Sequence, residues 1–514
     1  MQIPFRKSLN LELKIALGLF VGALFLWCLG LGTQALRDWD EGTYSGVARE
    51  IYQTGNWLFP TLFGEPYKPK PPLLHWIIAF TYQLFGVSDT TSRLLPAALS
   101  SLAVPLTYFI GREIFPSQMP AVFSALVYLT LLPAVRHGRL AMHDGIALSA
   151  FLLLLLCLLK TRHDRRWALG AGISLGLIGF SKGVLMVLLG GIAGIFLLVE
   201  GQLLPLLKNP FFWVGLGIGE APLVAWYAAQ SQHSGFLQTH FQEQSLDRVW
   251  RSVENNTGPI WYYLLEILKY AWPWLLFWPG GLGLAWRMRT QSWGRLVLVG
   301  TIAYLGAVSM MQTKLPWYVM PVYPFVALAI GARLGEAWAD PKALPKTWTA
   351  FLAFLGLASL GASTYIGWTE SRPSLIAMGV VLAASLGLAS WHSYHKNRQF
   401  IPVLLAGMYL TLGILFTSNF WLWELNEAFP AKPVGALVSQ QVPPKASVYI
   451  DFAYGRPSLN YYGERPINPI GGQDLQQLWA SRPYLLLREE TLAKVQLPDS
   501  RRLGTAAGFT LVGP

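Results

Sequence analysis

Long apolar segments separated by short polar ones recur along this chain from residue 13 to residue 418. Their lengths approach the ~20 residues that an α-helix needs to cross a bilayer. The pattern predicts an all-α polytopic membrane domain over residues 1–418 with about thirteen transmembrane helices. The expected spans are 13–32, 94–110, 119–133, 145–160, 167–180, 184–200, 210–228, 263–285, 296–311, 317–335, 348–367, 374–391 and 400–418.

The segment 167–200 is the weakest part of this pattern, because it fits one long span or two short ones broken at 181–183. Short cytoplasmic loops carry an excess of Lys and Arg. Two crossings here place every short basic loop on one side, which we expect to be cytoplasmic together with the N-terminus. These loops contain Arg6 and Lys7, Arg112, residues 160–166, Arg287 to Arg295, Lys342 and Lys346, and Lys396 and Arg398.

The composition changes after Ser418, where residues become richer in Pro, Gly and charge. Short apolar runs at 447–450 and 484–487 are separated by turn residues, and an amphipathic stretch lies at 474–480. Such runs are typical of short strands between loops. We expect residues 419–514 to form a small α/β domain outside the cytoplasm.

Composition agrees with a multi-pass protein of the inner (plasma) membrane. The chain is 53% hydrophobic and 13% charged, whereas soluble proteins have about 25% charged residues. The net charge of +12 fits orientation among membrane lipids better than nucleic-acid binding, so we expect no nucleic acid partner. Leu13 to Leu31 is too long for a signal-peptide core and indicates a retained anchor. Cys28 and Cys157 lie inside apolar runs, which disfavours a disulfide or a zinc site.

The first outer loop, residues 33–93, is unusually rich in polar and aromatic residues. Tyr44, Val47 and Ile51 recur at helical spacing, which predicts a helix in the membrane interface that ends near Gly55. Asp40 and Glu41 begin this helix, where the helix dipole favours ionised carboxylates. Both are candidate catalytic residues, although plain helix capping explains Glu41 equally well.

The Pro-Lys run 68–72 follows in the same loop. Its prolines fix the backbone, so Lys70 is presented rigidly beside aromatic residues. Anchoring to phospholipid headgroups is one explanation for such a lysine. A phosphate-bearing substrate is the other, and Lys70 is therefore a candidate binding residue.

The remaining outer loops supply further candidates. Ionisable residues at the ends of spans are functional candidates; the catalytic candidate among them is Asp144, and the substrate-binding candidates are Lys182, His240, Glu243, Arg248, Lys314 and Tyr318. Snorkelling to the interface is an equal alternative for Lys182. For Arg136, His137, Arg139 and His143 we expect interfacial anchoring. The chain lacks a P-loop, a dinucleotide fingerprint and an HExxH motif, so we expect a lipidic, anionic substrate and no nucleotide.

Several of these motifs together resemble one known family. They are Asp40-Glu41-Gly-Thr-Tyr44, Lys70-Pro-Pro-Leu73, Ser92-Arg93, Ser181-Lys182-Gly183 and Lys314-Leu-Pro-Trp-Tyr318. This set is similar to the ArnT-like and protein O-mannosyltransferase-like GT-C glycosyltransferases, which use polyprenyl-phosphate sugars. The resemblance is clear over residues 1–335 and looser beyond them. It implies thirteen spans and transfer of a sugar from an undecaprenyl or dolichyl phosphate to an envelope lipid such as lipid A, another glycan or a protein.

The resemblance also implies roles for single residues. Asp40 matches the family's presumed base, and Asp144 matches a second acidic residue near the reacting centre. Lys70 and Tyr318 match groups that bind the lipid phosphate, and Arg248 is a weaker match to an arginine of a later loop. ArnT has a metal-binding glutamate directly before the lysine of its Lys-Pro motif, whereas this chain has Pro69. No cofactor is therefore certain, and a divalent metal stays open.

Two other functions are compatible with a dozen spans. A transporter or flippase would place charges near mid-bilayer and contain an inverted repeat, whereas the ionisable residues here lie at the outer ends of spans. A non-catalytic lipid-binding or assembly protein would not need aspartates on separate loops. We therefore expect a glycosyltransferase.

Overall fold

The computed structural model describes residues 5–232, 235–236, 238, 242, 247–252, 256–422 and 429–514. The chain forms two compact units. The first, here the transmembrane unit, comprises Met1–Leu31, Lys68–Leu73 and Leu95–Trp421. The second, here the loop–sheet unit, comprises Gly32–Tyr67, Leu74–Leu94 and Leu422–Pro514. Most of the first outer loop thus folds with the C-terminal residues, whereas the expected domain boundary at 418/419 had separated the two segments.

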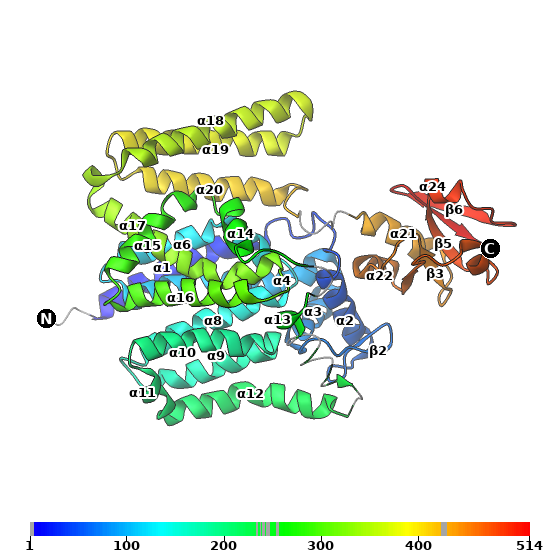
Figure 1. Ribbon diagram of the computed structural model, residues 1–514, viewed down its shortest axis with the longest axis horizontal. Coiled ribbons are helices and arrows are strands. Elements are labelled where there is room, and N and C mark those ends of the chain that lie inside the picture. The colour runs from blue at the N-terminus through cyan, green and yellow to red at the C-terminus, as the bar shows by residue number, and fades with distance from the viewer. Residues whose placement is uncertain are drawn as a thin grey trace. The chain divides into compact units, whose positions relative to one another are not determined.

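The transmembrane unit is built of helices, as the apolar pattern predicts. Figure 1 shows α18 and α19 as a long antiparallel pair, with α20 beside them. The helices of this unit are α1 (Phe5–Cys28), α5 (Ala103–Ile114), α6 (Gln118–Leu129), α7 (Leu132–Gly138), α8 (His143–Lys160), α9 (Trp167–Lys182), α10 (Leu185–Val199), α11 (Leu203–Leu207), α12 (Pro210–Gln230), α13 (Asp247–Trp250), α14 (Tyr262–Tyr270), η2 (Trp274–Leu276), α15 (Trp278–Arg287), α16 (Ser292–Met310), η3 (Pro316–Val322), α17 (Tyr323–Ala339), η4 (Pro341–Ala343), α18 (Lys346–Thr369), α19 (Pro373–Tyr394) and α20 (Phe400–Thr417). Helix α3 (Leu73–Phe85) lies almost entirely in the loop–sheet unit, and α4 (Asp89–Ser101) begins there and ends in the transmembrane unit.

Each of the thirteen predicted spans corresponds to helix in the structure. Among the described residues, nine helices are long and apolar enough to cross a membrane, and ten if the bent pair α6 and α7 is one span. The expected span 263–285 is divided into α14, η2 and α15, and proline, which removes a backbone donor, stands at Pro273 and Pro279. The segment 167–200 is two helices that end and begin around Gly183. The polytopic helical fold is confirmed, and the number thirteen stays a prediction.

Helices α9 and α12 approach each other closely because both present glycines four residues apart. A Cβ on Gly176 would lie 2.3 Å from the carbonyl carbon of Gly219, and one on Gly215 would lie 2.1 Å from the carbonyl oxygen of Leu169. Small residues at this spacing allow helix backbones to pack directly against each other in a membrane. The glycines therefore allow α9 and α12 to pack backbone against backbone.

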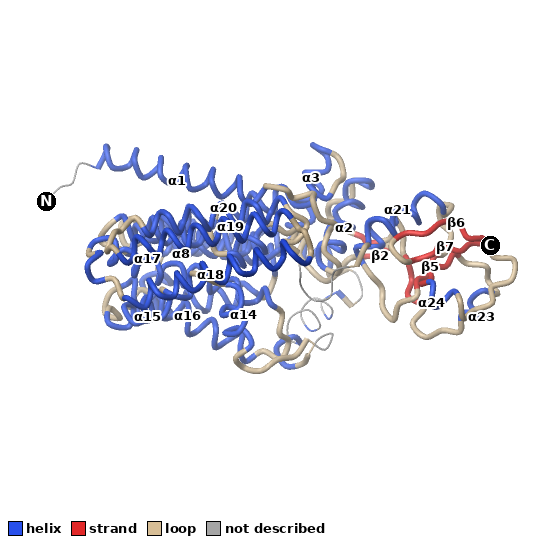
Figure 2. Tube along the Cα trace, turned by 90° about the horizontal axis from the view of Figure 1, so that it is seen from above, coloured by secondary structure: helices blue, strands red, loops and turns tan. Residues whose placement is uncertain are grey.

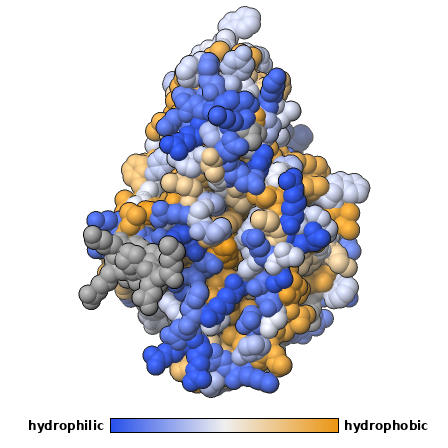
Figure 3. All heavy atoms as spheres, turned by 90° about the vertical axis from the view of Figure 1, so that its left-hand side faces the viewer, coloured by the Kyte–Doolittle hydropathy of each residue, from blue (hydrophilic) through white to orange (hydrophobic). Residues whose placement is uncertain are grey.

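The basic loops that the charge pattern placed on one side are joined by ion pairs at one end of the helices. Glu200 binds Arg162 at 2.8 Å and Arg295 at 3.2 Å. Lys160 binds Glu113, next to Arg112, at 2.9 Å. Figure 3, which faces the left-hand side of Figure 1, shows hydrophilic side chains gathered among hydrophobic ones. Three of the basic loops therefore lie at the same end of the bundle, as the topology requires.

The C-terminal part of the loop–sheet unit contains a five-stranded sheet in the order β4-β3-β5-β7-β6. Strands β4, β3 and β5 are parallel, whereas β7 pairs antiparallel with both β5 and β6. The predicted strands at 447–450 and 484–487 are β3 and β5. The bounds are β3 (Val448–Ile450), β4 (Ile467–Pro469), β5 (Tyr484–Arg488), β6 (Arg501–Ala506) and β7 (Phe509–Gly513), with α21 (Ala431–Gln441), α22 (Pro457–Gly463), α23 (Leu475–Trp479) and α24 (Glu489–Leu492).

Both faces of this sheet are buried, since alternate residues of a strand point to opposite sides. Leu486 belongs to the core shared with Val434 of α21, whereas Leu485 and Leu487 belong to the core shared with Trp479 of α23. Figure 2 shows the red strands of this sheet together with the short helices around them. The expected small α/β domain is confirmed.

Candidate active site

Asp40 is the first residue of α2 (Asp40–Thr54) in the loop–sheet unit. Its side chain is half-buried, and its Oδ1 accepts a hydrogen bond of 3.0 Å from the Tyr44 hydroxyl, one helical turn later. The helix ends as predicted at Gly55, which adopts a left-handed conformation with φ of 70°. A partly exposed carboxylate can take a proton from a substrate group within hydrogen-bond reach.

Glu41, the second catalytic candidate, is fully buried in an ion pair. Its carboxylate receives the Arg93 side chain at 2.8 Å from Nε and 2.6 Å from Nη2, and both side chains are fully buried. The backbone N–H of Arg37 donates a further hydrogen bond of 2.8 Å to Glu41. A two-pronged arginine–carboxylate pair fixes geometry as well as charge. This placement favours a positioning role for Glu41.

The residues before Asp40 are held by α22, from the C-terminal part of the chain. Asp38 binds the Arg456 guanidinium at 2.8 Å and accepts hydrogen bonds from the backbone N–H and hydroxyl of Ser458 at 3.1 and 2.8 Å. Trp39, between Asp38 and Asp40, has a positive φ of 63°. Such a conformation costs on the order of 1–3 kcal/mol for a non-glycine residue and persists only where the surroundings impose it.

Further contacts tie the first loop to the same C-terminal helix. Arg49 donates to the Tyr461 carbonyl at 2.7 Å, and its guanidinium lies 3.8 Å above the Tyr461 ring. The Tyr462 hydroxyl donates to Asp89 at 2.8 Å. Burial, and then the negative charge of Asp89, raise the pKa of Tyr462, so the hydroxyl remains a donor. Most of the apolar face of α2 is buried, and its place in the membrane interface stays a prediction.

Glu50, on the other face of α2, organises the loop that follows. It accepts hydrogen bonds from the Thr61 hydroxyl at 2.6 Å and from the backbone N–H of Phe63. These contacts hold the hairpin of β1 (Thr61–Leu62) and β2 (Glu65–Pro66). Neither Arg49 nor Glu50 is available for chemistry in this arrangement.

Three candidates meet in the transmembrane unit. Asp144, at the start of α8, binds Lys182, at the end of α9, with 2.5 Å between the carboxylate and the ammonium. The Lys182 ammonium also lies 5.6 Å from the centre of the Tyr318 ring, on η3. Both charged side chains are largely buried, with 11% and 17% of their surfaces exposed. Buried charges are paired when they are retained, so the snorkelling alternative for Lys182 is not supported.

Lys314 caps a helix. Its ammonium donates to the carbonyls of Val308 and Ser309 at 3.3 and 2.6 Å, in the last turn of α16, and lies 5.5 Å from the Tyr263 ring centre. Cations stabilise the carbonyl end of a helix. Burial lowers the pKa of Lys314. Two of its three donor positions are therefore used by the helix end.

The structure describes the other binding candidates only in part. Lys70 is half-buried in the transmembrane unit, in the non-helical Lys-Pro run. Arg248 lies in the short helix α13, and its side chain is outside the described part of the structure. His240 and Glu243 also lie outside the described residues. The binding roles predicted for Lys70, Arg248, His240 and Glu243 stay predictions.

The expectation of interfacial anchoring for the second outer loop is wrong for Arg139. Its side chain is fully buried, and it donates to the carbonyls of Leu26 and Leu29 at 2.8 and 2.5 Å, at the end of α1. The guanidinium also lies 3.9 Å from the ring centre of Phe416. Arg136, His137 and His143 are buried as well. In the sequence, Arg139 lies next to an apolar span, which is typical of anchoring at the membrane interface. In the structure, its guanidinium instead donates hydrogen bonds to carbonyls at a helix end inside the protein.

A metal site needs several ligating side chains close together. Among the described residues, no group of three or more His, Cys, Asp or Glu side chains is arranged to hold a metal ion. Pro69 stands directly before Lys70, where the ArnT-like pattern has a metal-binding glutamate. The residues described do not fit the implied metal site, and no step below depends on one.

Comparison with known proteins identifies the architecture. Residues 69–227 match the family model for dolichyl-phosphate-mannose-protein mannosyltransferase. The structure of ArnT from Cupriavidus metallidurans bound to undecaprenyl phosphate superimposes over 97% of both chains with a TM-score of 0.80 and 20% identity. The chain has the fold of ArnT.

Two curated relatives agree with this assignment. An undecaprenyl phosphate-alpha-4-amino-4-deoxy-L-arabinose arabinosyl transferase of Pseudomonas fluorescens is 28% identical over 360 residues, which cover 68% of this chain and 63% of that protein. The enzyme of the same name from Erwinia tasmaniensis is 26% identical over 416 residues, 76% of this chain and 75% of that protein. The ArnT-like chain thus matches less than two thirds of the first relative and three quarters of the second.

Sequence reasoning did not find the residues that support Asp40 in this ArnT-like fold. Asp38, Arg456 and Ser458 form the contact described above, and Asp89 binds Lys432 at 2.7 Å. Their sequence separations exceed 340 residues, and no local pattern links such distant positions. Arg93 was visible only as part of the Ser92-Arg93 motif. Correlated substitution between Asp38 and Arg456 across related sequences is the signal that would reveal their contact.

Proposed function

We propose that this protein transfers a sugar from a polyprenyl phosphate, undecaprenyl phosphate in a bacterium, to an envelope acceptor. The observation that carries the proposal is the match, over nearly the whole chain, to an ArnT structure that binds undecaprenyl phosphate. The proposed location is the inner membrane, with the N-terminus in the cytoplasm and the loop–sheet unit on the periplasmic side. No described feature and no comparison supports the transporter alternative.

Transfer proceeds by direct displacement in this proposal. The acceptor hydroxyl or amine attacks the anomeric carbon, and the bond from that carbon to the phosphate oxygen breaks. The electron pair leaves with the polyprenyl phosphate, and the configuration at the anomeric carbon inverts. The leaving phosphate is already an anion and needs no proton, so cations suffice to stabilise it.

Asp40 is the proposed general base. It lies at a helix N-terminus, is partly exposed, and accepts a hydrogen bond from the Tyr44 hydroxyl. A carboxylate with these properties accepts the proton that the acceptor loses. Glu41, by contrast, is neutralised by Arg93, and we assign it to positioning Asp40.

Lys182 is the proposed cation for the lipid phosphate, with Tyr318 beside it. Asp144 holds the ammonium at 2.5 Å, which keeps a mobile side chain in one place before the substrate binds. Lys70 contributes a second cation, presented by the Lys-Pro run, and Arg248 and Lys314 are secondary candidates. The acceptor class, whether lipid A, another glycan or a protein, is left to experiment.

The test is transfer by the purified protein in proteoliposomes, with a synthetic undecaprenyl-phosphate sugar and an envelope extract as acceptor. Product masses from a deletion strain and its parent identify the sugar and the acceptor. Asp40→Asn should lower turnover by about 100-fold or more, the usual contribution of a general base, and leave donor binding unchanged. Wild-type transfer by Asp40→Asn would falsify the assignment of the base.

A further inference from the structure

The loop–sheet unit contains a cavity of its own at the carboxyl ends of the parallel strands. The cavity is about 510 Å³ in volume and lies where β3, β4 and β5 end. Ligands of open α/β sheets bind outside the carboxyl ends of parallel strands, and ligand pockets measure roughly 300–1,000 Å³. Both the place and the size are those of a small-molecule site.

The backbone conformation of two glycines shapes the loops around the cavity. After β4 the chain turns through Gly471 and Gly472, whose φ values of 59° and 84° are left-handed. The Gly471 N–H donates to the carbonyl of Phe452 at 3.0 Å, which ties this loop to the one after β3. A Cβ on Gly472 would meet no atom within 4 Å. The glycine therefore serves the turn and leaves the space beside it open.

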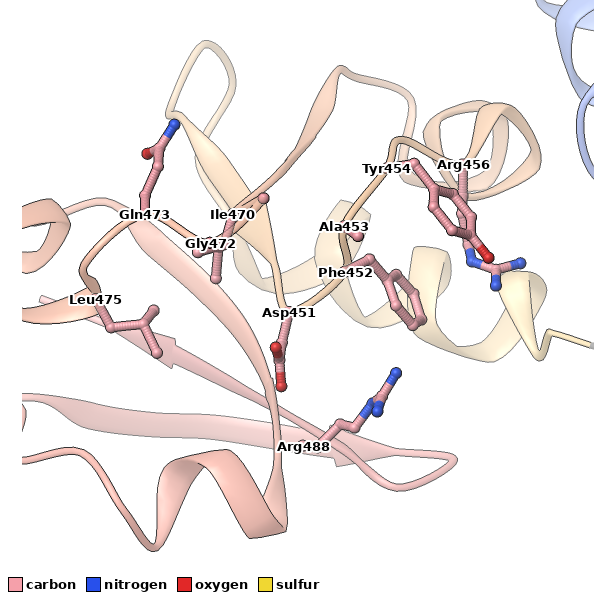
Figure 4. Close-up of a pocket in the computed structure, with 11 residues that line it drawn as sticks. Asp451, Phe452, Ala453, Tyr454, Arg456, Ile470, Gly472, Gln473, Leu475 and Arg488 are labelled. Carbon is pink, nitrogen blue, oxygen red and sulfur yellow. The ribbon is translucent and has the colours of Figure 1, made fainter. Parts of the chain in front are cut away.

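The lining combines flat aromatic surface with planar polar groups. Figure 4 shows Phe452, Tyr454 and Arg488 on one side of the cavity, Gln473 and Leu475 on the other, and Asp451 between them. The Arg488 guanidinium lies 5.2 Å from the Phe452 ring centre. Asp451 is fixed by the Thr491 hydroxyl. Carboxylate, amide and guanidinium together offer both acceptors and donors, which matches hydroxyl groups that do both.

The charges of the lining balance, which disfavours an anion. Arg456 is neutralised by Asp38 at 2.8 Å, and the negative charge of Asp451 opposes the positive charge of Arg488. A phosphate would be attracted to the arginine and repelled by the carboxylate. A neutral polyol has no such penalty, and its apolar ring face can rest on an aromatic side chain.

One residue that lines the cavity also contacts the chain segment that contains the candidate base. The Tyr454 ring lies 5.7 Å from the ring of Trp39, and both side chains are well exposed, at 49% and 39%. Trp39 directly precedes Asp40 in the chain. Trp39 and Tyr454 thus form an exposed aromatic pair that joins the lining of the cavity to the chain segment of the general base.

We propose that this cavity is a saccharide-binding site that takes a glycan portion of the acceptor. The role of the bound glycan as acceptor rests on the proposed function, whereas the binding itself does not. Substitutions in the cavity should raise the KM for a glycan acceptor and leave kcat nearly unchanged, because none of these groups acts on the reacting atoms.

Saturation-transfer NMR on the full-length protein in lipid nanodiscs tests the site. The probes are glucose, galactose, mannose and the disaccharide chitobiose, each at millimolar concentration, with inorganic phosphate as competitor. We expect saturation transfer to at least one saccharide, a loss of tenfold or more in affinity for Asp451→Asn and Gln473→Ala, and no change for Gln477→Ala, which is exposed on α23 outside the cavity. Phosphate should not compete.

The proposal is overturned if none of the four saccharides shows saturation transfer, if the two cavity variants bind as the wild type does, or if phosphate displaces the sugar. Asp40→Asn separates the site from the proposed function. Saccharide binding that survives in Asp40→Asn while transfer is lost supports both. Unchanged transfer in Asp40→Asn would remove the proposed base and leave the saccharide site standing.

Discussion

Asp38 and Arg456 are 418 residues apart in the chain, yet the carboxylate of Asp38 accepts a hydrogen bond of 2.8 Å from the Arg456 guanidinium. Only 1% of the Asp38 side chain and 10% of the Arg456 side chain are exposed. The contact anchors the residue two positions before the proposed base to the C-terminal part of the chain. The C-terminal residues are therefore part of the support of the candidate active site.

Removal of one partner of this pair should disturb both stability and turnover. Asp38→Asn leaves the Arg456 charge buried without a counter-ion, at a cost of about 3–5 kcal/mol. It also releases the strained backbone at Trp39 (φ 63°), so Asp40 is no longer held in place. We expect a lower unfolding temperature in detergent and a reduced kcat with little change in donor KM.

The matched control for Asp38→Asn is Arg482→Ala, which removes an exposed ion pair with Asp499 in the same unit. Exposed pairs contribute about 0–1 kcal/mol, so this variant should resemble the wild type in both measurements. If Asp38→Asn were as stable and as active as Arg482→Ala, the C-terminal contact would have no part in positioning Asp40.

The pair of Glu41 and Arg93 distinguishes a positioning role from a catalytic one. Glu41→Ala should destabilise the protein by about 3–5 kcal/mol, because Arg93 stays buried and unpaired. The double variant Glu41→Leu with Arg93→Met should regain much of this stability, since apolar replacement of a buried ion pair is often neutral. Thermal unfolding in detergent and sugar transfer in proteoliposomes measure the two effects.

If Glu41 only positions Asp40, the double variant should regain sugar transfer together with stability. A double variant that unfolds at the wild-type temperature and transfers no sugar would show instead that the Glu41 carboxylate takes part in the chemistry.

Much of the fold follows from local pattern, whereas the support of the site does not. Apolar segments of bilayer length predict the helices, and short apolar runs such as 484–487 predict the strands of the sheet. Asp40 and Lys182 became candidates because they are charged residues at the start of an interfacial helix and at the end of a span, positions that are often functional when they face a cavity. The pairing of Lys182 with Asp144 needed the packing of α8 against α9, and the pairing of Asp38 with Arg456 needed the whole chain.

One error has a clear physical cause. The positive charge of Arg139 was interpreted as a membrane-surface signal. In the structure Arg139 binds carbonyls at the end of α1, and the apolar face of α2 is likewise buried against protein. An amphipathic helix or a buried arginine has the same sequence pattern whether its partner is lipid or protein, so periodicity alone cannot tell them apart.

Close packing of α2 against α22 provides a third prediction. A Cβ on Gly42 would lie 2.4 Å from the backbone nitrogen of Ser458, whereas a Cβ on Gly46, one turn later, would meet only the end of the Leu62 side chain at 2.9 Å. Backbone cannot move aside as a flexible side chain can. Gly42→Ala should therefore separate the two helices and reduce transfer, while Gly46→Ala should keep near wild-type activity. Equal transfer by the two variants would contradict the close contact.

The cluster of Asp144 and Lys182 should behave as a unit in double-mutant cycles. Lys182→Met removes the proposed phosphate cation and should lower kcat/KM by about 100-fold, in the range for the loss of one electrostatic contact to a transition state. Asp144→Asn should cost less on its own and nothing further in the Lys182→Met background, because its role is to hold the ammonium. Arg372→Ala, which breaks an exposed pair with Glu370, is the control. Additive losses in the double variant would show that Asp144 acts independently of Lys182.

Lys314 should influence how stability and activity depend on pH. Burial lowers the pKa of this lysine, so on raising the pH the folded protein releases the proton before the unfolded chain does. Between the two pKa values the unfolded chain binds more protons, and the contribution of this group to the free energy of unfolding rises with pH.

Activity should change in the opposite direction, because the neutral amine of Lys314 no longer makes charge-assisted hydrogen bonds to the end of α16. Lys314→Arg, which stays protonated, should extend activity to higher pH, measured as kcat/KM in proteoliposomes. Lys269→Arg, at an exposed lysine, should leave the profile unchanged, and an unshifted alkaline limb in Lys314→Arg would exclude Lys314 as its source.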